Sequence, residues 1–173
     1  MVFFLKCLIS IGIVSITTYL GFSRSKNLSS REYILKDMVT FFNLVENEIK
    51  YMLTILPNAY EIARQKLITN LKNVIGNIVV DMLKNNSSFE NEKSVMENVS
   101  TLSELTDYDK SVFISTLNNL GNSNLESQLN IIENTKQILN DQIKEAIIKK
   151  QESARVYKSI GVISGVMIVL VFI

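Results

Sequence analysis

The chain has 173 residues, of which 47% are hydrophobic, and a formal net charge of +1. It contains no histidine and a single cysteine, which excludes a disulfide within the chain and argues against metal sites and nucleophilic sites built from these residues. The nearly neutral charge gives no basic surface for nucleic acid, so we expect no nucleic-acid partner.

The first hydrophobic segment lies at the N-terminus, where residues 2–22 carry Lys6 as their only charge. This length is sufficient for a transmembrane helix. A cleaved signal peptide is the alternative, but no small-residue cleavage motif follows the segment. Basic residues that oppose translocation come directly after it: Arg24, Lys26 and Arg31. We therefore predict an uncleaved transmembrane anchor over residues 1–23.

A second hydrophobic segment lies at the other end of the sequence, where no residue after Lys158 is charged. From Tyr157 onward a helix would be about 26 Å long, close to the bilayer hydrocarbon thickness of about 30 Å. A buried or interfacial C-terminal helix is the alternative to a transmembrane helix over residues 157–173. Gly161 and Gly165 form a G-x-x-x-G pattern, whose small residues allow two membrane helices to pack closely.

Basic residues flank both segments on the side that faces the middle of the chain, so the positive-inside rule places residues 24–156 in the cytoplasm. This central part carries 16 basic and 17 acidic residues and is long enough for one domain with a hydrophobic core. Contact of its basic edges with anionic membrane lipid is also expected.

The spacing of apolar residues at three and four predicts helix throughout the first half of this domain. Ser29 and Glu32 form a capping-box pattern before the first helix, and Pro57 suits the first turn of the second. The predicted core positions of these two helices are Ile34, Leu35, Met38, Phe41, Phe42, Val45, Ile49 and Met52, then Ala59, Ile62, Ala63 and Leu67. A third helix buries Leu71, Val74, Ile75, Ile78, Val79 and Met82.

In the second half, the polar residues 84–93 predict a loop, followed by a short segment with Val95, Met96, Val99 and Leu102. Thr106 and Asp109 are predicted to cap a helix that buries Val112, Phe113, Leu117 and Leu120 and ends at Gly121. Ser123 and Glu126 predict the start of a last helix of about 50 residues that continues into residues 157–173. The predicted fold is all-α: a bundle of about five or six helices flanked by an N-terminal and a C-terminal transmembrane helix.

No group of residues predicts catalysis. Glu46 with Glu48, and Asp107 with Asp109, are carboxylate pairs, but residues two apart on a helix point to different faces. We interpret them as helix surface and helix cap. A glycine-rich phosphate loop is also absent from the sequence, so we predict no catalytic residues, no cofactor and no metal.

Four short motifs, ENEIKY, LPNA, LGNSNLESQL and RVYKSIGVISG, occur in an order that resembles the stage III sporulation protein AB family of endospore-forming bacteria. The resemblance covers nearly the whole chain, and the last motif matches best. The family more often has aspartate where this chain has Asn124. The resemblance implies a cytoplasmic domain similar to the helical bundle of the type II secretion F protein.

The resemblance also implies a place in the channel complex that joins mother cell and forespore. The expected protein is a non-enzymatic scaffold in the mother-cell membrane facing the forespore. Its expected partners are a cytoplasmic secretion-type ATPase, the stage III sporulation protein AA, and other membrane components of the complex. A homo-oligomer is possible in this arrangement. A membrane-anchored signalling or adaptor protein, whose long last helix carries a signal, is the alternative.

The hypothesis for ATPase docking combines the resemblance with the residues around the turn between the first two helices. A turn followed by a proline-started helix can direct polar groups toward a partner at a small loss of entropy. The predicted docking residues are Glu46, Glu48, Lys50, Tyr51 and Asn58.

Overall fold

The structure of the protein is a computed structural model that describes residues 30–84, 88–121 and 124–172. The side chains of residues 88–90 and 153–172 lie outside this description. Arg31–Lys144 form one compact unit, which we call the bundle, and the rest of the chain belongs to a second unit.

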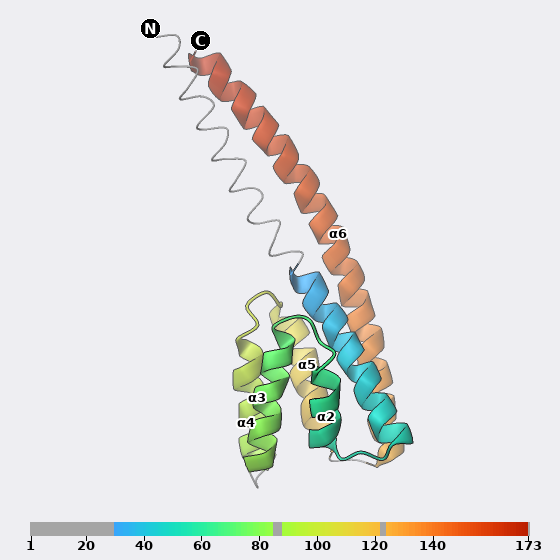
Figure 1. Ribbon diagram of the computed structural model, residues 1–173. Helices are drawn as coiled ribbons and strands as arrows, with labels where there is room; N and C mark the ends of the chain where they lie inside the picture. Colours follow the sequence, from blue (N-terminus) through green and yellow to red (C-terminus); the bar gives the residue numbers. More distant parts are fainter. Residues whose placement is uncertain (1–29, 85–87, 122–123, 173) are drawn as a thin grey trace. The chain divides into compact units, whose positions relative to one another are not determined.

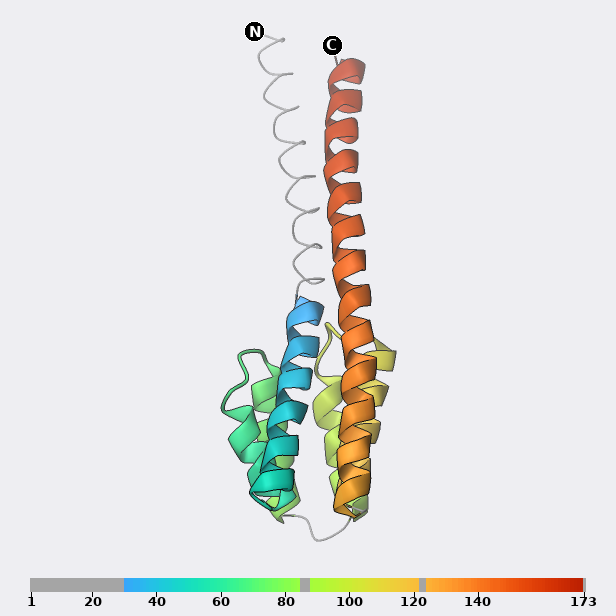
Figure 2. The ribbon, with the colours of Figure 1, turned by 90° about the vertical axis from the view of Figure 1, so that its right-hand side faces the viewer.

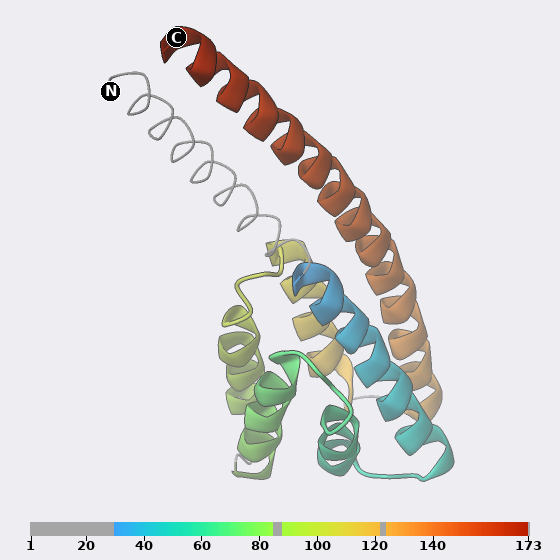
Figure 3. The ribbon, with the colours of Figure 1, turned by 45° about the horizontal axis from the view of Figure 1, so that its top comes forward.

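The described residues form six helices and no strand, which confirms the predicted all-α class (Figure 1). Residues 30–51 are helical and are called the first helix here. The others are α2 Leu56–Arg64, α3 Leu71–Lys84, α4 Ser88–Ser100, α5 Asp107–Asn119 and α6 Leu125–Phe172. Within the bundle, the first helix lies antiparallel beside the first half of α6, and α3 lies beside α4 (Figures 2 and 3).

The core of the bundle contains four aromatic rings from three helices. Phe41 lies edge-on to the ring of Tyr60 at 5.1 Å and to that of Phe42 at 5.4 Å, and Phe113 of α5 lies 5.4 Å from Phe42. The predicted stripe of the first helix is buried with one exception, Met52, which follows the end of the helix and is exposed.

One core prediction in the short helix α2 is wrong, and one core residue of this helix was missed. Ile62 was predicted to be buried but is exposed, whereas Tyr60 is buried and fills the space beside Phe41. The buried face of α2 is therefore Ala59, Tyr60 and Ala63. Pro57 lies in the first turn of this helix, as predicted, where its missing N–H leaves no hydrogen bond unmade.

The loop predicted for residues 84–93 is wrong in part, because α4 already begins at Ser88. Ser94 donates a hydrogen bond to Asp81 of α3, so polar residues of this segment contribute to helix packing. Val95, Val99 and Leu102 are buried as predicted. Met96 was predicted as core but is exposed.

Local capping signals in the second half of the bundle are confirmed with one correction. Thr106 and Asp109 form the capping box of α5, and Gly121 has a φ of +93°, the left-handed region that favours glycine. Before α6, Asn124 Oδ1 accepts a hydrogen bond from the backbone N–H of Ser127 at 2.9 Å. Asn124 therefore caps α6, while the predicted capping residues Ser123 and Ser29 lie outside the described residues.

The last helix is continuous, as predicted: α6 comprises 48 residues from Leu125 to Phe172. In the part of the chain that the structure describes, there is no helix with the length and apolar character needed to cross a membrane. The predicted anchor over residues 1–23 lies outside that part, and so do the side chains of residues 157–173, including the positions of Gly161 and Gly165.

A candidate docking surface at the turn after the first helix

Glu48 builds the turn that follows the first helix. Its carbonyl oxygen accepts hydrogen bonds from the backbone N–H groups of Met52 at 3.2 Å and Thr54 at 3.1 Å. Its carboxylate Oε2 accepts a further bond from Thr54 Oγ1 at 2.8 Å. Glu48 was predicted to contact a partner, but both its backbone and its side chain are used to hold the turn.

Leu53 lies inside this turn with a φ of +52°, the only non-glycine residue with a positive φ among those described. The left-handed conformation costs a residue with a Cβ atom roughly 1–2 kcal/mol, so such residues persist only where the surrounding structure holds them. The three hydrogen bonds that Glu48 accepts, from Met52 before Leu53 and from Thr54 after it, supply this restraint. Further along the chain, the carbonyl of Ile55 accepts bonds from the first N–H groups of α2.

Four apolar side chains of the turn face solvent, and together they are called the hydrophobic tip. Their exposed fractions are 67% for Tyr51, 70% for Met52, 76% for Leu53 and 65% for Ile55. Contiguous apolar patches on the order of a few hundred Å² are uncommon on soluble surfaces and often mark interaction sites. The sequence prediction included only Tyr51 of this set. The apolar run YMLTIL across a helix end was the available signal, since a turn cannot bury all of its side chains.

Glu46 joins the first helix to α6 through an ion pair. Its Oε2 lies 2.7 Å from Lys136 Nζ, which also lies 2.8 Å from Glu133 Oε2. Burial would lower the pKa of Lys136, but the hydrogen bonds to Glu133 and Glu46 outweigh it and raise that pKa. The charge of Glu46 is therefore compensated inside the bundle.

The other three predicted docking residues are exposed at the turn. The ammonium of Lys50 lies 5.2 Å from the centroid of the Tyr51 ring, a cation–π contact. Asn58 lies in the first turn of α2 and is exposed. The structure thus retains Lys50, Tyr51 and Asn58 as surface groups at the turn and assigns Glu46 and Glu48 to internal contacts.

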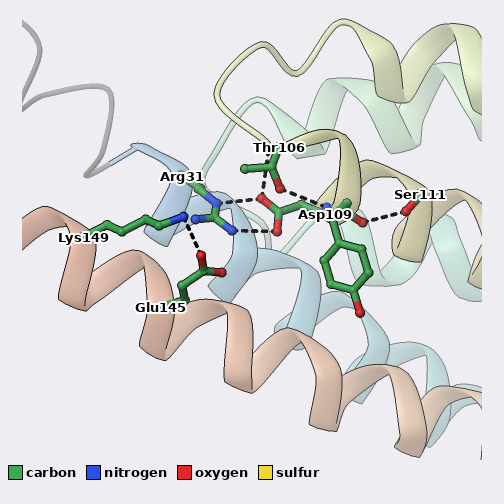
Figure 4. Close-up of polar contacts among 7 residues, drawn as sticks. Arg31, Thr106, Asp109, Ser111, Glu145 and Lys149 are labelled. Atoms are coloured by element: carbon green, nitrogen blue, oxygen red, sulfur yellow. Dashed lines mark hydrogen bonds and ion pairs between the residues drawn. The ribbon is translucent and has the colours of Figure 1, made fainter.

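A buried ion pair lies in the bundle, well separated in sequence from the hydrophobic tip (Figure 4). Arg31 Nε donates to Asp109 Oδ2 at 2.6 Å and Arg31 Nη2 donates to Asp109 Oδ1 at 2.9 Å. Asp109 also completes the capping box, because its Oδ2 accepts from the backbone N–H of Thr106 at 2.9 Å. Arg31 was predicted only as a basic residue at the membrane edge, yet it is 6% exposed.

The environment of Asp109 keeps this carboxylate ionised. Burial alone would raise the pKa of Asp109, but the hydrogen bonds from Arg31 and Thr106 outweigh it and hold that pKa below its usual value. Because its two oxygens accept hydrogen bonds from Arg31 and Thr106, Asp109 is suited to a structural role. Neither carboxylate pair named from the sequence converges on a common site, since Glu46, Glu48 and Asp109 each bind a different partner.

Comparison with known protein families matches residues 6–173 of the chain to the family described as Stage III sporulation protein AB. No curated protein and no solved structure matches the chain significantly.

Proposed function

Because the chain belongs to the stage III sporulation protein AB family, we propose that it is a non-enzymatic membrane scaffold of the complex that joins mother cell and forespore. A role in sporulation follows from the family itself. In our proposal, the scaffold couples a cytoplasmic secretion-type ATPase, the stage III sporulation protein AA, to the membrane components of the channel. The observation that carries this proposal is the hydrophobic tip on an otherwise well-packed bundle.

The proposed scaffold has two transmembrane helices, over residues 1–23 and 157–173, in the mother-cell membrane that faces the forespore. Residues 24–156 then lie in the cytoplasm, in agreement with the basic residues beside both segments. In a Cys7→Ser background, Asn86→Cys should resist a membrane-impermeant thiol reagent in intact cells, whereas a cysteine added after Ile173 should react. Labelling of Asn86→Cys would place the domain outside and contradict this topology.

The position of the hydrophobic tip within the bundle suits an ATPase in the cytoplasm. The first helix, residues 30–51, ends at the hydrophobic tip. At about 1.5 Å per residue, it is about 33 Å long. In the sequence, the predicted anchor precedes the N-terminal end of the first helix, and the hydrophobic tip follows its C-terminal end.

Binding of the ATPase is tested with the full-length chain in lipid nanodiscs and the purified ATPase, by calorimetry. We expect saturable binding with one defined stoichiometry, and circular dichroism of the nanodisc sample checks that the helices are intact. Absence of binding at protein concentrations of about 100 μM would mean an affinity weaker than that of ordinary specific complexes, and it would refute the coupling role.

A membrane-anchored signalling or adaptor protein remains the second candidate, and the continuous helix α6 favours it, since one helix of 48 residues can carry a rotation from its far end into the bundle. The time of expression separates the two candidates. A scaffold of this complex should be present only in the mother cell during sporulation, whereas a general adaptor should also be present during growth.

A further inference from the structure

We propose that the hydrophobic tip inserts into an apolar pocket of its partner and that a carboxylate at the rim of this pocket pairs with Lys50. This inference rests on the proposed docking of the ATPase and specifies the chemistry of the surface that the ATPase must present. It keeps Lys50 and Tyr51 of the predicted docking residues and adds the apolar side chains of the turn.

The apolar part of the inference follows from what the turn exposes. The side chains of the hydrophobic tip come from five successive positions, interrupted only by Thr54, whose hydroxyl is turned to Glu48. Each of the four is about two-thirds exposed or more. Large aromatic and aliphatic side chains that enter a partner's pocket supply most of the binding energy of an interface. A concave apolar pocket is the partner surface that would remove these side chains from water.

The charge of the surface around the hydrophobic tip favours an acidic rim. Of the two carboxylates in the last turns of the first helix, Glu46 is paired with Lys136, and the Glu48 carboxylate accepts a hydrogen bond from the Thr54 hydroxyl within the turn. Lys50 is exposed, and within the described ranges it has no carboxylate partner. Its contact with the Tyr51 ring keeps the ammonium beside the hydrophobic tip. A carboxylate on the partner would pair with this exposed ammonium and would increase the association rate.

The backbone of the hydrophobic tip is held by neighbouring residues and therefore loses little conformational entropy on binding. Leu56, the first residue of α2, packs so closely on Gly121 that a Cβ atom at Gly121 would lie 2.9 Å from Leu56 Cδ1. Pro57 stiffens the start of α2, and Glu48 holds Leu53 in its left-handed conformation. A preorganised surface of this kind binds at a smaller entropic cost than a flexible loop.

The test measures the affinity of the full-length chain in nanodiscs for the purified ATPase, with matched variants. Leu53→Ser should weaken binding by roughly tenfold or more, as expected for an anchor side chain. Ile68→Ser is the control, because Ile68 is 84% exposed but lies in the connection between α2 and α3, away from the hydrophobic tip. The Ile68→Ser variant should bind like the wild type.

The carboxylate at the rim is tested with charge variants at Lys50. Lys50→Glu should weaken binding by about threefold or more at low salt, with a smaller effect at high salt, and Lys50→Arg should retain wild-type affinity. Equal affinities for Lys50→Glu and the wild type at low salt would contradict the proposal that a carboxylate of the partner pairs with Lys50.

The outcomes separate this inference from the proposed function. If the wild type binds the ATPase and Leu53→Ser binds as tightly as Ile68→Ser, the hydrophobic tip is not the docking surface, although ATPase coupling stands. If the wild type itself does not bind, both proposals fall. Circular dichroism of each variant verifies that the helix content is unchanged before affinities are compared.

Discussion

Replacing Leu53 with glycine should give a more stable protein than replacing it with alanine. Both variants remove the same side chain, which is 76% exposed, so the loss of apolar contacts is nearly equal in the two. They differ in the backbone, because alanine retains a Cβ atom in the left-handed conformation that the turn imposes at φ +52° and glycine does not.

The expected difference follows from two opposing effects. The left-handed conformation costs alanine roughly 1–2 kcal/mol, a cost that glycine avoids. Glycine gains more conformational freedom in the unfolded chain, which favours unfolding by about 0.4–1 kcal/mol. The balance is about 0.5–1 kcal/mol in favour of Leu53→Gly. At a residue with ordinary negative φ the order is reversed, with glycine the less stable by up to about 1 kcal/mol.

The assay is urea unfolding of the detergent-solubilised chain, followed by the circular dichroism of its helices. Ile68 supplies the control pair: its φ is not positive, so Ile68→Ala should be more stable than Ile68→Gly. The reasoning is refuted if alanine gives the more stable protein at both positions. In addition, Leu53→Gly and Leu53→Ala should lose affinity for the ATPase to the same extent. The loss of binding is then independent of the difference in stability between the two variants.

Three further predictions concern other parts of the chain. Asp109→Asn should lower the free energy of unfolding by about 3–5 kcal/mol, since it leaves a buried guanidinium without its carboxylate, and a loss below 1 kcal/mol would contradict the buried pair. The pKa of Asp109 is lowered in the folded protein, so its contribution to stability is complete above the unfolded pKa of about 3.9 and is lost as the pH falls through the folded pKa. Acid unfolding of Asp109→Asn should lack this loss of stability. Gly121→Ala should destabilise the protein by about 1 kcal/mol or more, because its φ is +93° and the new methyl group meets Leu56; thermal unfolding measures this, and an unchanged midpoint argues against the strained turn. Replacing both Gly161 and Gly165 with isoleucine should weaken helix association in a membrane two-hybrid assay, whereas an undiminished signal would indicate a plain anchor.

Local signals predicted much of the helical structure because their interactions join residues a few positions apart. The Thr106 and Asp109 capping box, Pro57 at the start of α2 and Gly121 after α5 were all recognisable in the sequence and are present in the structure. Each depends on hydrogen bonds or dihedral angles within one turn of helix, which neighbouring residues largely determine. The spacing of apolar residues similarly predicted the buried face of the first helix.

The roles of the charged residues were decided only by tertiary structure. Arg31 and Asp109 are 78 residues apart, and Glu46 and Lys136 are 90 apart, so no local pattern could pair them. Packing of the helices brings these charges together, and it gives Glu46 an ion-pair partner that the sequence did not indicate.

The exposure of the turn after the first helix was likewise a tertiary outcome. By itself, the sequence determined an all-helical chain with two hydrophobic segments and a break before Pro57, because periodicity and backbone chemistry are local properties. It did not determine which apolar residues near that break would be buried. Met52 and Leu53 are exposed because no helix among the described residues covers them. Burial depends on which elements pack together, and only the folded arrangement of the helices contains that information.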